Sequence, residues 1–218
     1  MVMWDSARFT GPKHLQKGAR DMGKNFGGIL LGILLALCLV ACGSRAEPPK
    51  PGDTRGGVPD LRGRSVLVYP VQLLTAVPSG TSVDAELAHA FRARGPGVTW
   101  ILPSQAEDAL RRSPGLRART RGLPVRVFLQ AEVQRIGDPL FGEVARLATL
   151  TGADVALLPV ELAYGEEGAY QLSAALIRVQ TGHVLWFGML QGAEGAPESP
   201  AALASVAETL ARALVPMG

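Results

Sequence analysis

An apolar segment at residues 26–40 constrains the chain more than any other feature of its sequence. It reads FGGILLGILLALCLV and carries no charged side chain. A bilayer span needs roughly 20 apolar residues, whereas the apolar core of a secretory signal peptide needs about 7 to 15. Lys24 precedes the segment, and Lys17 and Arg20 lie further upstream, as in the positive region of such a peptide. The segment therefore predicts a cleaved leader, with the folded part of the chain behind it.

The residues behind this segment resemble the lipobox of bacterial lipoproteins. Positions 39–42 read LVAC, with Leu at −3, a small residue at −1 and then the obligatory cysteine. In that family the thiol accepts a diacylglyceryl group, and a dedicated peptidase then cuts before the modified residue. The resemblance implies cleavage between Ala41 and Cys42, a signal peptide at 1–41 and lipid on Cys42. Gly43, where an Asp would favour inner-membrane retention, implies the outer membrane facing the periplasm if the source is Gram-negative.

Two alternatives for the leader stay open at this point. A plain transmembrane anchor ending near Cys42 is disfavoured, because the first basic residues behind it are Arg45 and Lys50 rather than an immediate positive cluster. Met22 could also be the true start, since it would give the leader a more compact positive region.

Charge and cysteine content limit what the mature part of the chain can do. Residues 1–41 hold five basic and two acidic side chains, so the totals of 22 and 19 leave 17 of each sign from Cys42 onward. The pI of 9.1 therefore belongs to the leader. A neutral domain lacks the cationic excess that nucleic-acid binding needs. Cys38 and Cys42 are the two cysteines, so the mature domain cannot form an internal disulfide.

A segment rich in proline and glycine follows the cysteine, at residues 42–63. It offers almost no apolar side chain to bury. Such a composition predicts an extended, solvated tether that gives the domain clearance from the membrane.

Residues 64–218 alternate between strand and helix patterns. Apolar residues recur at helical spacing after Thr81 (Val83, Leu87, Ala90 and Phe91), and Ser104 with Glu107 has the form of a capping box. Residues 124–136 suit a strand or a helix. We predict strands at 65–71, 98–102, 153–163, 169–179 and 183–190, and helices after residue 81, at 104–112, at 138–152 and from Pro200. The order predicts one α/β (α+β) domain with a single mixed sheet and helices packed on it.

Three segments carry a resemblance to a known group of envelope domains. They are SVLVYP from Ser65, LATLTGADVALLP from Leu147 and IRVQTGHVLW from Ile177. They are similar to elements of the domain shared by the TolB amino-terminal domain, the curli-secretion lipoprotein and the LpoB-type activators of penicillin-binding proteins. The resemblance implies this α/β fold and a protein partner. Long amphipathic hairpins are missing and Val179 replaces a usual acidic residue, so neither channel activity nor any binding residue carries over.

No catalytic, metal or cofactor constellation emerges from the residues. His89 and His183 are isolated from one another and have no cysteine partner, so a metal site is disfavoured. The sequence contains no Gly-x-Ser-x-Gly elbow. Glu166 and Glu167 could form a carboxylate pair, but a solvated hairpin tip is the simpler interpretation. We therefore predict that the protein is not an enzyme and carries no cofactor.

A local basic patch is the one candidate contact surface. It is made of Arg111, Arg112, Arg117, Arg119 and Arg121, with Arg126 nearby. Such a patch could contact lipid headgroups, peptidoglycan or an acidic partner. The alternative is a solvated loop whose charges are balanced by acids elsewhere, which the neutral total favours.

These observations predict a membrane-anchored, non-catalytic envelope lipoprotein. It would bind a protein partner in the assembly or regulation of an envelope machine, without nucleic acid and with an oligomeric state that the sequence leaves open. The alternatives are an envelope enzyme acting on cell wall or lipid, and a lipoprotein that binds a small ligand. Either alternative needs a pocket with convergent polar groups.

Overall fold

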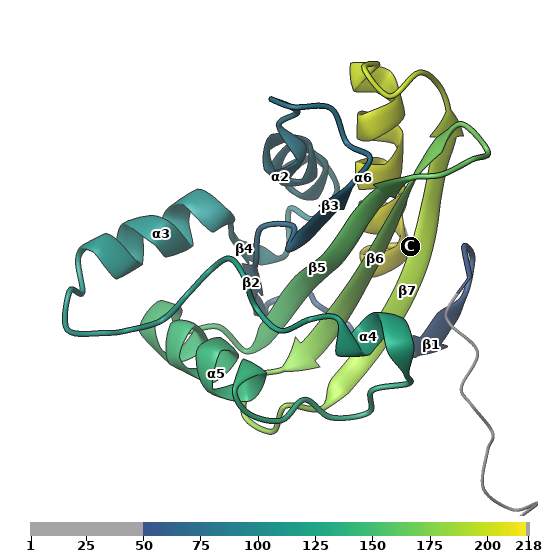
Figure 1. The fold of residues 1–218 in the computed structure, drawn as a ribbon. Helices are drawn as coiled ribbons and strands as arrows, with labels where there is room; N and C mark the ends of the chain where they lie inside the picture. The colour runs from purple at the N-terminus through teal and green to yellow at the C-terminus, as the bar shows by residue number, and fades with distance from the viewer. Residues whose placement is uncertain (1–49, 217–218) are drawn as a thin grey trace, which may run out of the picture. The chain divides into compact units, whose positions relative to one another are not determined.

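Seven strands form one mixed sheet in the computed structural model, which describes residues 50–216 (Figure 1). The sheet order is β1-β7-β6-β5-β2-β4, with β3 beside β5, and helices lie on both faces. The predicted α/β (α+β) domain with one mixed sheet is confirmed. The strands are β1 Thr54–Gly56, β2 Ser65–Val68, β3 Leu73–Thr75, β4 Thr99–Ile101, β5 Val155–Tyr164, β6 Ala169–Arg178 and β7 Val184–Glu194. The helices are α2 Val83–Arg94, α3 Pro103–Arg111, α4 Val127–Gln130, α5 Leu140–Thr151 and α6 Pro200–Leu214.

The connections explain why one part of the sheet is parallel and the other antiparallel. Strands β2, β4 and β5 run parallel, and helices lie in the chain between them. Strands β5, β6, β7 and β1 pair antiparallel. Short turns suffice for antiparallel neighbours, whereas parallel neighbours need a long crossover. The turn between β6 and β7 uses Gly182 at φ 71°, where an added Cβ would lie 2.9 Å from the Phe141 ring.

Helices α2 and α6 pack against one face of the sheet and against each other. The predicted stripe of α2 is buried at all four positions, from Val83 to Phe91. The last helix buries its predicted stripe too, including Leu203, Val206 and Leu210. Phe91 stacks on Trp100 of β4 with ring centroids 4.6 Å apart. Burial of such side chains stabilises by about 1.5–3 kcal/mol each, so this face holds much of the core.

The opposite face carries a smaller cover that reaches only part of the sheet. Helices α3 and α5 lie over β2 and β5, and the connection that contains α4 crosses β6 and β7 (Figure 1). Phe128 of α4 stacks on Phe187 of β7 with centroids 6.0 Å apart. Residues 124–136, which suited strand or helix, thus form the short helix α4 and extended flanks.

The segment expected to be a solvated tether is partly folded onto the sheet. Thr54–Gly56 form β1 and pair with β7, and the Gly52 N–H donates to the Met189 carbonyl at 2.7 Å. Leu61 is 3% exposed. This corrects the tether prediction for residues 50–63, because backbone pairing needs no apolar side chains and composition therefore did not reveal it. The predictions for Ala41, Cys42 and the start at Met22 lie outside the described residues.

Two helix starts also differ from the sequence pattern. Helix α3 begins at Pro103, one residue before the predicted capping box of Ser104 and Glu107. Pro103 presets a helical φ at the first position, and the Leu102 N–H donates to the Gln105 side-chain oxygen at 2.8 Å. Helix α2 is preceded by Ser82 rather than Thr81. Of the helices in residues 50–216, none has the length and apolarity to cross a membrane.

Candidate binding surface

The connection at residues 113–122, here called the arginine loop, is held down by the carboxylate of Glu143. Glu143 lies on α5 and is 7% exposed. The Arg119 N–H donates to its Oε2 at 2.9 Å, and the Arg119 Nε lies 3.5 Å from Oε1. The Arg146 guanidinium lies 2.9 Å from the same Oε1. Three donors therefore satisfy this buried carboxylate, as a buried charge requires.

These contacts shift the protonation of two neighbouring groups. Burial alone would raise the pKa of the Glu143 carboxyl, but the Arg119 amide and the Arg146 guanidinium outweigh it and hold that pKa below its ordinary value. Burial and the Glu143 carboxylate raise the pKa of the Tyr69 phenol. Glu143 therefore stays ionised and Tyr69 neutral, and neither is poised for proton transfer near neutral pH.

Gln72 and Asp84 hold the other end of the arginine loop. Gln72 donates to the Thr120 carbonyl at 2.8 Å and accepts from the Leu123 N–H at 3.1 Å. Asp84 accepts from Arg121 at 2.6 Å and from a backbone N–H near the end of β2. The arginine loop is thereby tied to α2, α5 and the segment behind β2.

The predicted arginine patch consequently separates into two groups. Arg111, Arg119 and Arg121 pair with Asp108, Glu143 and Asp84 respectively. The exposed Arg112, Arg117 and Arg126 make no ion pair within residues 50–216. Arg119 and Arg121 thus fix the arginine loop, whereas Arg111 pairs with a residue of its own helix.

A second surface lies on the same sheet face, beyond the reach of α4 and α5. We call it the open half of the sheet, and it consists of two rows of residues across β3, β5, β6 and β7. Residues paired across strands point to the same face. The rows are Leu73–Glu161–Ser173–Met189 and Thr75–Ala163–Gln171–Gln191.

The boundary of the open half falls at a β-bulge beside Pro159. The register of β5 against β6 shifts between Pro159 and Glu161, as expected for a proline that donates no ladder hydrogen bond. Before the bulge, Leu158 is fully buried under the helical cover. After it, Glu161 and Ala163 are half-buried, while the small side chain of Ser173, between Glu161 and Met189, is 2% exposed. Figure 1 shows no helix in front of this end of β5, β6 and β7.

Apolar and acidic groups share the open half and its rim. Met189 and Ala163 are half-buried, beside the amides of Gln171 and Gln191. Five glutamates, which we call the acidic rim, lie at this end of the sheet: Glu161, Glu166, Glu167, Glu194 and Glu198. Glu198 lines a hollow between the starts of α2 and α6, on the side opposite the open half. No side chain of the acidic rim takes part in an ion pair with any residue of 50–216.

Hydrogen bonds hold together the two turns that carry most of the acidic rim. The Gly195 N–H donates to the Gly168 carbonyl at 2.9 Å, and the Tyr164 hydroxyl donates to the Gly195 carbonyl at 2.8 Å. The Tyr170 hydroxyl donates to the Pro197 carbonyl. Burial and the charge of Glu198 raise the pKa of Tyr170. The β5–β6 turn and the segment behind β7 therefore form one ordered end of the sheet.

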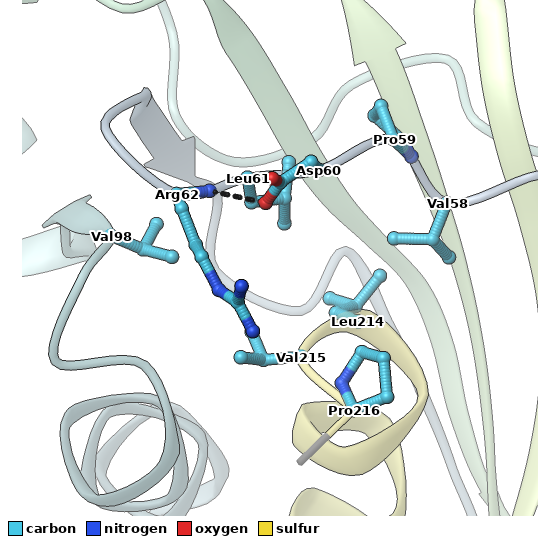
Figure 2. A pocket seen from close by; sticks show the side chains of 9 residues that line it. All are labelled: Val58, Pro59, Asp60, Leu61, Arg62, Val98, Leu214, Val215 and Pro216. Carbon is cyan, nitrogen blue, oxygen red and sulfur yellow. Dashed lines mark hydrogen bonds between the residues drawn. The ribbon is translucent and has the colours of Figure 1, made fainter. Parts of the chain in front are cut away.

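Two surface hollows of residues 50–216 contain groups that the sequence singled out or that line an apolar opening. A hollow of about 310 Å³ lies between residues 58–62, Val98 and the end of α6. Figure 2 shows the side chains that line it, most of which are apolar. Its Asp60 carboxylate accepts from the Arg62 N–H at 3.0 Å. His183 lines a different hollow with Arg55 and Glu132, away from His89 on α2. Within residues 50–216, no three His, Cys, Asp or Glu side chains group as metal ligands.

Comparison with known proteins gives matches to solved structures alone. No protein-family model matches the chain, and no curated protein matches its sequence. The LpoB C-terminal domain from Salmonella enterica is 19% identical with a TM-score of 0.44, over 64% of this chain and 88% of that one. The LpoB C-terminal domain from Escherichia coli is 23% identical with a TM-score of 0.40, over 62% of this chain and 85% of that one. The PelC dodecamer from Paraburkholderia phytofirmans is 14% identical with a TM-score of 0.39, over 76% of this chain and 97% of that one.

LpoB is thus among the solved structures as well as in the group that the sequence resembles. At these identities the likeness concerns the fold. The function must be argued from the residues of this chain.

The sequence contained a signal for the open half that its total charge concealed. Residues 147–177 and 179–211 contain no Lys or Arg, although both stretches contain several acids. The net charge of zero for the mature chain conceals this separation of acidic and basic residues along the sequence. The pairing of the strands then brings acids from both stretches to one end of the sheet.

Proposed function

We propose that the protein is a lipid-anchored, non-catalytic envelope lipoprotein whose domain binds a protein partner in the assembly or regulation of an envelope machine. The LVAC motif at 39–42, directly behind a 15-residue apolar segment, is the observation that carries the proposal. It makes Cys42 the lipidated residue and Ala41 the residue before the cut. The expected address is the outer membrane facing the periplasm.

The state of the charged groups supports binding rather than catalysis. Glu143 is the one buried charged side chain of residues 50–216, and its three donors leave it no free role in acid–base chemistry. The open half of the sheet offers unpaired charge and half-buried apolar groups without a surrounding pocket. This combination suits a macromolecular partner better than a small substrate.

The folded position of β1 limits where that partner can be met. Eight residue steps separate Cys42 from Lys50, so their Cα atoms can lie at most about 29 Å apart. A domain attached through lipid on Cys42 therefore works close to the bilayer surface. The segment of the partner that contacts this domain must therefore also lie close to the bilayer surface.

Mass spectrometry of the mature amino terminus tests the anchor. We expect the chain to begin at Cys42 with the mass of attached acyl chains, and to sediment with membranes. The Cys42→Ser variant should remain uncut and carry no added lipid. Recovery of residues 1–41 on a chain with unmodified Cys42 would overturn the anchor and indicate a transmembrane segment.

Co-purification after crosslinking in cells tests the partner. The wild-type chain should bring down a defined envelope protein, and Cys42→Ser should lose it because the chain no longer resides at the membrane. A lipidated protein that is recovered alone and monomeric would contradict the proposed role.

A further inference from the structure

The open half of the sheet points to the kind of partner that the domain binds. Resting on the proposed partner-binding role, we propose that this surface docks a cationic segment of the partner protein, rich in Lys or Arg and with apolar side chains between them. The segment would lie across β5, β6 and β7, with its apolar groups on Met189 and Ala163 and its charges at the acidic rim.

The uncovered state of this face is the first argument. A sheet face is ordinarily covered by another layer, and the opposite face of the same strands is buried under α2 and α6. Leu162, Leu172 and Leu190 lie on that opposite face and are at most 8% exposed. On the open face the neighbouring positions Ala163, Gln171 and Met189 keep contact with solvent. Helices α2 and α6 thus cover one face of these strands, and the other face remains accessible to a partner.

The charge of the acidic rim is the second argument, and it decides the chemistry of the occupant. Five carboxylates surround this end of the sheet without one ion pair among residues 50–216, and the strands β5 and β7 carry no Lys or Arg. Like charges at one end of a neutral domain repel each other and attract a cationic partner. Complementary charges speed association and reject wrong partners.

The arginine loop is the alternative contact surface, suited to an acidic partner, and part of its charge is already paired within the domain. Acids within the domain already pair with Arg111, Arg119 and Arg121. An acidic partner would compete at Arg119 and Arg121 with the ion pairs that hold the arginine loop. A cationic partner at the acidic rim would meet only two side-chain hydrogen bonds within residues 50–216, from Thr75 to Glu161 and from Gln191 to Glu167.

Photo-crosslinking in cells tests the proposal on the full lipidated chain. A benzoylphenylalanine probe replaces Gln191 in the open half or, as the matched site, Arg117 in the arginine loop. We expect a specific protein adduct from position 191 and none from position 117. Peptide mapping of the adduct should place the contact in a Lys- or Arg-rich segment.

Two charge variants then separate docking by charge from mere proximity. Glu166, Glu194 and Glu198 are exposed, and their side chains make no hydrogen bond or ion pair within residues 50–216. E166Q/E194Q/E198Q therefore removes three charges and is expected to leave the fold intact. R112Q/R117Q/R126Q removes three charges of opposite sign from equally exposed sites. The acidic triple should lower the adduct yield from position 191 about tenfold, and the basic triple should leave it unchanged.

The remaining outcomes each have a defined meaning. An adduct from position 117 alone would overturn this inference and leave the partner-binding role standing. Three other results would also overturn this inference. They are an adduct yield from position 191 that is unchanged in the E166Q/E194Q/E198Q variant, a contact segment rich in acidic residues, and an adduct to a second copy of this chain. If neither site gives an adduct while crosslinking in cells still brings down a partner, this inference is overturned and the partner-binding role stands. If crosslinking also recovers the lipidated protein alone, both proposals are overturned.

Discussion

One sheet face carries two regions that treat charge in opposite ways. In the covered half, buried Glu143 pairs with Arg119 and Arg146, and the charges lock a loop onto the sheet. In the open half, the acidic rim has no ion pair among residues 50–216. Charged groups of the covered half hold the fold together, whereas the carboxylates of the open half are not paired with a cation of residues 50–216. Substitutions in the two halves should therefore differ in kind as well as in size.

The largest difference is expected between two apolar truncations. Phe128→Ala removes a ring that is 2% exposed and stacked on Phe187, and it should lower the free energy of unfolding by about 3–4 kcal/mol. Met189→Ala in the open half should cost about 1 kcal/mol or less, because Met189 is half-buried on the uncovered face. Urea unfolding of both variants measures the contrast. Equal costs would show that the open half is packed as tightly as the covered one.

A smaller effect is expected for the buried carboxylate, and it should depend on pH. Glu143→Gln should cost about 2 kcal/mol at pH 7, because it leaves the Arg146 and Arg119 contacts without their anion. The folded-state pKa of Glu143 is lowered, so its contribution is present above the unfolded pKa and is lost as pH falls through the folded value.

Unfolding measured between pH 7 and pH 3 checks this sign. The difference between wild type and Glu143→Gln should shrink below about pH 4. Glu166→Gln is the matched control, since this exposed carboxylate makes no hydrogen bond or ion pair within residues 50–216 and should change the stability by less than about 0.5 kcal/mol. A gap for Glu143→Gln that widens in acid would refute the role assigned to this carboxylate.

The smallest effect is a gain in stability from the acidic rim. The E166Q/E194Q/E198Q variant relieves repulsion between like charges, so it should unfold at slightly higher urea, with a gain of a few tenths of a kcal/mol at low salt. Because salt screens exposed charges, the gain should vanish near 1 M salt. Loss of stability in this variant would mean that the rim carries contacts needed by the fold.

Sequence patterns predicted the elements that bury apolar side chains. The stripe of Val83, Leu87, Ala90 and Phe91 and the long strand through Leu157 both follow from periodicity. Strands β1 and β3 escaped prediction because they are placed by backbone pairing with a longer strand, whereas the equally short β4 lies in an apolar run. Their side chains carry little pattern of their own.

The candidate surface was predictable only in part, for a different physical reason. The arginines of residues 111–126 stand close together in sequence, so a local count finds them, but their acid partners lie up to 37 residues away. The acidic rim is invisible to a local count because strand pairing assembles it from β5, two turns and the end of β7. A search for long stretches without Lys or Arg would have found it. Where the helical cover ends is a property of packing, which sequence spacing does not reveal.

Thiol labelling in intact membranes tests the central claim most directly. The chain has no cysteine after Cys42, so a single cysteine introduced at Gln191 or at Arg117 is the only thiol when Cys42 is lipidated. Both positions should react with a maleimide at similar rates in the purified, lipidated protein. In native membranes the cysteine at 191 should be protected several-fold relative to the cysteine at 117. Equal labelling at the two positions, or protection at 117 alone, would contradict docking on the open half of the sheet.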